Sequence, residues 1–185
     1  MQASIVSELW PVSRNSRIAQ ILLALAGTCL LAISAKVQVP FWPVPMTMQT
    51  FVVLVLAIAY GPKLGFFTGA LYLLEGALGL PVFASGVGAA YLLGPTGGYL
   101  FGFVIAMSVV GFLVSKGWGQ TALSVMGVML IGEIIIFSLG VGWLSGVVGF
   151  SKAISLGLTP FLLAEAFKVV LAVVTVPLVW RALKR

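Results

Sequence analysis

The chain has 185 residues, of which 61% are hydrophobic and only 8% are charged. Because about a quarter of the residues in a soluble domain are normally charged, this composition excludes an ordinary soluble protein and predicts an integral membrane protein. The net charge of +6 comes from ten Lys and Arg residues scattered between apolar runs. They form no basic stripe, so we expect no nucleic-acid partner.

Apolar sequence divided by Pro, Gly and Lys clusters predicts six membrane helices. In chain order they cover residues 18–38, 47–60, 64–79, 96–115, 119–142 and 158–181. The sequence of the first predicted helix also has features of a signal peptide. Residues 18–35 are long enough to span a bilayer, however, and more helices follow, which favours an uncleaved helix. The expected fold is an all-α bundle of six transmembrane helices in a single domain, residues 1–185.

The basic residues orient this bundle. If both termini are cytoplasmic, two basic residues, Lys36 and Lys152, face outward. Seven then lie on the inner side: Arg14, Arg17, Lys63, Lys116, Arg181, Lys184 and Arg185. This is the bias of the positive-inside rule, so we expect both termini in the cytoplasm.

The same orientation gathers three unusual segments on the outer side, residues 39–45, 80–95 and 145–157. Long loops on one face are typical of a lid over a binding site, because pocket residues concentrate on loops held by a rigid scaffold. Ordinary connections between helices are the alternative.

Charged groups within the apolar runs are the strongest functional signal. Glu165 and Lys168 are three residues apart on the last predicted helix, so both project from one face. Such groups are costly in a membrane, which favours a binding role over a structural ion pair. Glu75 and Glu133 have no basic neighbour in the sequence and receive no assigned role.

The sequence lacks the residues that several kinds of functional site require. The chain has no His and a single Cys, Cys29, so we expect no metal site, no nucleophile–base pair and no disulfide. There is no phosphate-binding G-x-x-x-x-G-K-[ST] loop, so the chain is not expected to hydrolyse ATP itself. We expect no cofactor and no catalytic residues; an enzyme using Glu133 or Glu165 as a base remains a weaker alternative.

Small residues recur every four positions on the first helix, at Ala24, Thr28 and Ala32. Such a ladder allows another helix to approach closely. Packing within the bundle and docking of a partner are equally compatible with it.

Three motifs and the acid–lysine pair resemble one known family. Residues 39–51 (VPFWPVPMTMQTF), 79–83 (GLPVF) and 93–99 (LGPTGGY), followed by Glu165-x-x-Lys168, resemble the BioY family. These are the biotin-specific substrate-binding (S) components of energy-coupling factor (ECF) transporters. The resemblance implies a compact six-helix bundle in a prokaryotic plasma membrane that holds biotin near its outer face. It also implies a membrane coupling subunit and cytoplasmic ATPases as partners, with Ala24, Thr28 and Ala32 as the docking face.

The resemblance implies roles for particular residues. The family's usual Asp-x-x-Lys is Glu165-x-x-Lys168 here; the acid would accept from a ureido N–H of biotin and the lysine would donate to its carbonyl. The same scaffold carrying another vitamin is the alternative. The further candidates are Phe41, Trp42 and Tyr91 for an aromatic wall, Thr47, Gln49 and Ser85 for hydrogen bonds, and Lys36, Lys152 or the N–H groups near Thr96 for the biotin carboxylate.

Overall fold

The computed structural model describes residues 5–183, and most of this range is helical. The helices are α1 (Ile5–Leu9), η1 (Pro11–Arg14), α2 (Arg17–Lys36), α3 (Gln49–Ala77), α4 (Ala89–Leu92), α5 (Gly97–Ser115), α6 (Ala122–Val148), α7 (Phe150–Gly157), η2 (Thr159–Phe161) and α8 (Leu162–Leu183). Two short strands, β1 (Gln38–Val39) and β2 (Met46–Thr47), pair antiparallel. The predicted all-α membrane fold is confirmed: five helical stretches of the described chain are long and apolar enough to cross a membrane.

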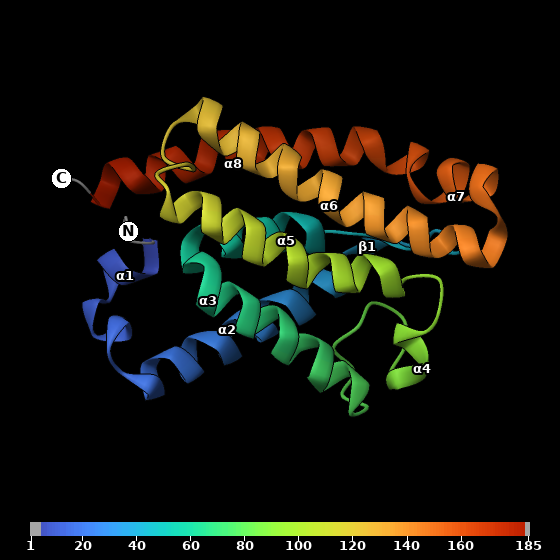
Figure 1. The fold of residues 1–185 in the computed structure, drawn as a ribbon, viewed down its shortest axis with the longest axis horizontal. Helices are drawn as coiled ribbons and strands as arrows, with labels where there is room; N and C mark the ends of the chain where they lie inside the picture. Colours follow the sequence, from blue (N-terminus) through green and yellow to red (C-terminus); the bar gives the residue numbers. More distant parts are fainter. Residues whose placement is uncertain (1–4, 184–185) are drawn as a thin grey trace.

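The long helix α3 folds back on itself at Gly61. This residue has φ 74° and ψ −175°, a left-handed conformation that glycine tolerates, and Pro62 follows it. In a straight helix Gln49 and Tyr72 would be about 35 Å apart at 1.5 Å per residue. The Gln49 amide nevertheless donates to the Tyr72 hydroxyl at 2.7 Å. The two limbs of α3 are therefore antiparallel, and Figure 1 shows the reversal.

The reversal in α3 bears on the predicted helix count. Residues 47–60 and 64–79 were expected as two helices, and they correspond to the two limbs of one element. A count of six membrane crossings treats each limb as one crossing. That count and the cytoplasmic placement of the termini stay predictions. Helix α1 and the C-terminal end of α8 do lie at the same end of the bundle (Figure 1). Of the basic residues counted above, Lys184 and Arg185 lie outside the described range.

The helix boundaries differ most from the prediction after residue 142. The sequence predicted a helix end there and a loop over 145–157, whereas α6 continues to Val148 and α7 follows it almost directly. Glycine is frequent in membrane helices and does not end this one. Gly140 leaves room for the ring of Tyr99, which packs against it. The third outer segment is thus mainly helical.

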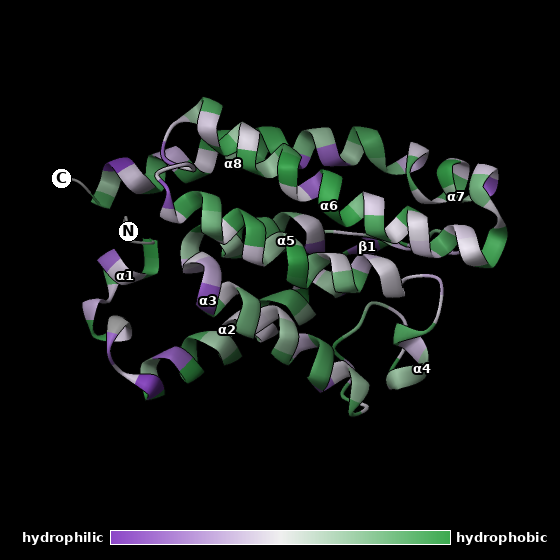
Figure 2. Ribbon diagram, in the orientation of Figure 1, coloured by the Kyte–Doolittle hydropathy of each residue, from purple (hydrophilic) through white to green (hydrophobic). Residues whose placement is uncertain are grey.

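The distribution of side chains is that of a protein surrounded by lipid. Large apolar side chains cover the outside, among them Ile18, Leu163 and Phe167, which are 72%, 71% and 68% exposed. Figure 2 shows hydrophobic residues along the long helices and hydrophilic ones gathered at the end where the termini lie. Glu165 and Lys168, in contrast, are buried.

The small residues of α2 pack within the chain. Ala24 and Thr28 are buried, and the Thr28 hydroxyl donates to Glu75 Oε1 on α3 at 3.0 Å. Ala32 is half-buried and packs against the hydrophobic core. The Thr28 side chain therefore faces the second limb of α3 and gives Glu75 a packing partner. The docking role expected for Ala24, Thr28 and Ala32 stays a prediction.

The outer connections are tied to one another. The β1–β2 pair closes the loop of residues 40–45. At the end of α2, the Lys36 ammonium donates to the carbonyl of Phe83 at 2.6 Å and Gln38 donates to the carbonyl of Ala84 at 3.3 Å. On α6, the Trp143 indole donates to the carbonyl of Gly94 at 3.0 Å. These bonds hold the loops after α2 and α3 at one end of the bundle.

Candidate functional site

A buried polar cluster joins α3 and α8. Pro160 in η2 precedes α8, and the helix carries Glu165 and Lys168 one turn apart on its buried face. The Lys168 Nζ lies 2.8 Å from Glu165 Oε1. The Thr50 hydroxyl on α3 donates to Glu165 Oε2 at 2.7 Å and accepts from Lys168 at 2.9 Å. Each carboxylate oxygen of Glu165 therefore has a donor supplied by the protein.

The ammonium of Lys168 is fully engaged in this arrangement. It donates to the Thr47 carbonyl at 2.6 Å, in addition to Thr50 and Glu165. An ammonium has three N–H donors and no acceptor. Lys168 therefore holds Glu165 and Thr50 in place, whereas Glu165 is the charged member of the pair that lines the adjoining cavity.

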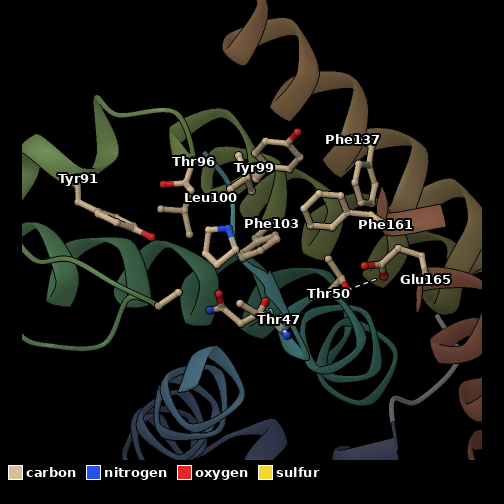
Figure 3. A pocket seen from close by; sticks show the side chains of 14 residues that line it. Thr47, Thr50, Tyr91, Thr96, Tyr99, Leu100, Phe103, Phe137, Phe161 and Glu165 are labelled. Carbon is tan, nitrogen blue, oxygen red and sulfur yellow. Dashed lines mark hydrogen bonds between the residues drawn. The ribbon is translucent and has the colours of Figure 1, made fainter. Parts of the chain in front are cut away.

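That cavity lies between α3, α5, α6 and the start of α8 and measures ≈ 40 Å³. We call it the aromatic cavity, since five of its lining residues are Tyr91, Tyr99, Phe103, Phe137 and Phe161. Figure 3 shows Tyr91 at one side of the view and Glu165 at the other, with the remaining rings between them. Rings offer a wall for an apolar ligand, and Glu165 with Thr50 offers a polar end.

The expected hydrogen-bonding residues meet at this cavity. Thr47, Gln49, Tyr91 and Glu165 all line it. Ser85 is exposed and lies beside the cavity, with its hydroxyl 3.4 Å from that of Tyr91. Glu165 and its helical neighbour Lys168 thus lie close to the loop residues that the sequence motifs singled out.

Of the three rings expected to form an aromatic wall, one lines the cavity. Phe41 and Trp42 are 45% and 78% exposed and do not line the cavity. They belong to the loop between β1 and β2. Tyr91 is the one predicted ring that lines the cavity, and the others come from α5, α6 and η2.

Gln49 is positioned by a chain of hydrogen bonds. Its amide nitrogen donates to Tyr72, whose hydroxyl donates to the Val82 carbonyl at 2.9 Å. Phe83, next in the loop, is fully buried between the rings of Tyr72 and Tyr91, with ring centroids 5.5 Å and 5.1 Å away. The loop after α3 is therefore anchored to the start of α3, which carries Gln49 and Thr50.

Of the three groups suggested for a carboxylate, one lines the cavity. Lys36 is bonded to the loop carbonyl of Phe83, and Lys152 is exposed on α7. Thr96 is buried, lines the cavity and directly precedes α5. A helix N-terminus presents backbone N–H groups with a positive partial charge, which favours an anion.

Sequence reasoning missed Thr50 and four of the rings. Thr50 follows Gln49 in the quoted motif, and its bond to Glu165 is a contact between residues 115 apart in the chain. Tyr99 also follows a quoted motif, and its hydroxyl donates to the Gly157 carbonyl at 2.8 Å. Phe103, Phe137 and Phe161 had no signal, since aromatic residues are common throughout the apolar helices.

Glu133 on α6 is a further buried acid beside this cluster. It is 8% exposed and close enough to Glu165 and Lys168 for electrostatic interaction. Neither carboxylate oxygen accepts a hydrogen bond from the described residues. The cluster thus holds two acids and one amine. No group of three or more His, Cys, Asp or Glu residues able to hold a metal ion occurs within residues 5–183.

Comparisons with known proteins identify the family. Residues 7–185 match the model of the BioY family. The biotin transporter BioY of Thermotoga maritima is 42% identical over 155 residues, which cover 83% of this chain and 90% of that protein. The biotin transporter BioY2 of Lactococcus lactis is 34% identical, with 87% and 90% covered. A crystal structure of the S-component for biotin from an ECF-type ABC transporter superposes with a TM-score of 0.76 at 26% identity, covering 92% of this chain and 94% of that one. This chain therefore belongs to the BioY family.

Proposed function

We propose that this protein binds biotin and mediates its uptake as the substrate-binding subunit of an ECF-type transporter. The observation that carries the proposal is the Glu165 carboxylate, held by Thr50 and Lys168 at one end of an aromatic cavity. The names of the related proteins from Thermotoga maritima and Lactococcus lactis support biotin as the substrate.

The chemistry of biotin suits the two ends of the cavity. Its ureido ring has two N–H donors, and Glu165 retains lone pairs beyond those used by Thr50 and Lys168. A bond from an N–H to a buried carboxylate is charge-assisted and therefore strong. The thiophane ring packs against aromatic side chains such as Phe137 and Tyr99, and the valerate carboxylate points toward Thr96 and the start of α5.

The role of Lys168 follows from its three bonds. It neutralises Glu165 and fixes Thr50, so both acceptors are oriented before the ligand arrives. To donate to the ureido carbonyl it gives up one of these bonds, and the Thr47 carbonyl is the partner not involved in holding Glu165. This makes Lys168 first a positioning residue and then a ligand contact.

The cavity must widen to hold a vitamin. Pockets for ligands of this size measure roughly 300–1,000 Å³, against ≈ 40 Å³ here. Val44, Pro45, Ala84 and Tyr91 line the cavity and lie on or next to the outer loops. Displacement of these loops opens the site, as expected for a lid.

We further propose a prokaryotic plasma membrane location and partnership with a coupling subunit and cytoplasmic ATPases, in line with the ECF-type transporter that yielded the similar S-component structure. We propose that α2 contributes the docking surface, through Ala24, Thr28 and Ala32 together with the exposed residues Leu22, Ala26 and Leu30 of the same helix.

Isothermal titration calorimetry of the purified chain with biotin tests the binding step. We expect one site per chain. Desthiobiotin, which keeps the ureido ring, should compete, whereas lipoate, which keeps only the valerate chain, should not. Competition by lipoate or by an unrelated vitamin, with none by desthiobiotin, would favour the alternative substrate. Recovery of chemically altered biotin by mass spectrometry would favour the enzyme alternative.

A further inference from the structure

A second, much larger groove lies away from the aromatic cavity. It measures ≈ 970 Å³ and is bounded by α1, η1, α2, the reversal of α3 and the end of α5. None of its lining residues lines the aromatic cavity. The function proposed above makes no use of it.

The groove is amphipathic. At its polar part it carries the exposed cations Arg17, at the start of α2, and Lys63, directly after the Gly61–Pro62 reversal. Neither forms an ion pair within the described chain. No Asp or Glu of the described residues lines the groove, and Glu8 on α1, next to the lining residue Ser7, does not line it either.

Two apolar strips form another part of the wall, beside the polar lining residues Ser7, Ser13, Gln20, Tyr60 and Ser115. Ile21 and Leu25 follow Arg17 at helical spacing on α2, while Phe67 and Leu71 follow Lys63 on the second limb of α3. Each cation therefore stands at the end of an apolar strip that runs along a membrane-spanning helix.

We propose that this groove binds an anionic phospholipid, with Arg17 and Lys63 holding the headgroup phosphate and the strips on α2 and α3 packing against an acyl chain. Basic pockets between transmembrane helices on the cytoplasmic side are typical sites for anionic headgroups. Arginine and lysine both suit phosphate, the first through a bidentate fork and the second as a point charge. The bound lipid braces the α3 reversal against α1 and α2.

The test uses the purified, delipidated full-length chain in detergent. Phosphatidylglycerol and phosphatidylcholine with identical acyl chains are added, and lipid retention is measured by native mass spectrometry together with thermal unfolding. We expect phosphatidylglycerol to be retained and to raise the melting temperature more than phosphatidylcholine. The double variant Arg17→Gln/Lys63→Gln should weaken phosphatidylglycerol binding by about 25-fold, roughly fivefold for each cation lost.

Lys116→Gln is the matched control. Lys116 is an exposed cation at the end of α5, outside the groove, where it lies 5.4 Å from the centre of the Phe112 ring. This variant should keep the wild-type preference for phosphatidylglycerol. Biotin affinity should be unchanged in both variants, since none of these residues lines the aromatic cavity. An unchanged biotin affinity also shows that each variant is folded.

Three kinds of outcome would overturn the proposal. One is the absence of a preference that depends on the groove, seen either as equal retention of the two lipids or as loss of the preference in Lys116→Gln as well. Another is the same stabilisation by soluble glycerol phosphate, which would make the groove a phosphate site without an acyl-chain role. The third is an Arg17→Gln/Lys63→Gln variant that keeps its lipid preference but loses co-purification with a coupling subunit, which would assign the groove to a protein partner. If the double variant does not fold, the wild-type preference must still fall as salt rises to about 0.5 M, because ions screen exposed charges.

Discussion

The Thr50 hydroxyl on α3 lies 2.7 Å from Glu165 Oε2 on α8 and donates a hydrogen bond to it. The same hydroxyl accepts from Lys168, so one small side chain orients both members of the buried ion pair. Glu165 can therefore present a fixed acceptor to the aromatic cavity before a ligand is bound.

Replacement of Lys168 by Ala should reduce biotin affinity by about 100-fold or more, because it leaves Glu165 as an uncompensated buried charge. Calorimetry measures the loss directly. Lys152→Ala, which removes an exposed cation on α7, is the control and should bind as the wild type does. Unchanged affinity in Lys168→Ala would remove the lysine from the site.

Thr50→Val should lower biotin affinity by about tenfold, since it keeps the side-chain shape and removes the donor to Glu165. Thr50→Ser keeps the hydroxyl and should restore most of the affinity. A useful comparison is Thr175→Val on α8, where the exposed hydroxyl bonds only to the Leu171 carbonyl. An equal loss in both Val variants would argue for a general effect on helix packing.

Glu133→Gln should leave biotin affinity within about threefold of the wild type, because Glu133 does not line the cavity. Glu165→Gln should cost more than about tenfold, since a carboxylate facing the ligand becomes a neutral amide. Calorimetric titration of both variants with biotin measures the two losses of affinity. A larger loss in Glu133→Gln than in Glu165→Gln would make Glu133 the acid that recognises the ligand.

Gly140→Ala should lower the melting temperature by about 5 °C and also weaken binding, because the added methyl group meets the ring of Tyr99 in the cavity wall. Gly142→Ala, two residues further along α6, meets no atom within 4 Å and should be neutral or slightly stabilising. Thermal unfolding in detergent measures both. If Gly142→Ala destabilised the protein equally, the effect would not come from Tyr99.

The sequence predicted those parts of the molecule that depend on local spacing. Glu165 and Lys168 lie three residues apart on a helix and form the expected pair, and Gly61–Pro62 marks the reversal of α3. Features that depend on tertiary packing were missed. The bond from Thr50 to Glu165 has no local signal, and neither does the outward position of Trp42, which depends on how β1 and β2 close their loop.

The small residues of α2 also show that spacing in the sequence cannot predict which elements pack together. The spacing of Ala24 and Thr28 correctly indicated close approach of a helix. It could not indicate which helix approaches, and the structure places the second limb of α3 there. The partner-docking role of this face was inferred from the resemblance and stays a prediction.

The reversal at Gly61 has a consequence for how the mouth of the site is assembled. Because the limbs of α3 run side by side, the chain enters the ligand region through Thr47 and Gln49 and returns to it at Ala84 and Tyr91. The helical hairpin formed by the two limbs of α3 thus connects the loops on both sides of the entrance. If this hairpin pivots, both loops are carried with it, so admission of the cargo requires no separate, coordinated hinge in each loop.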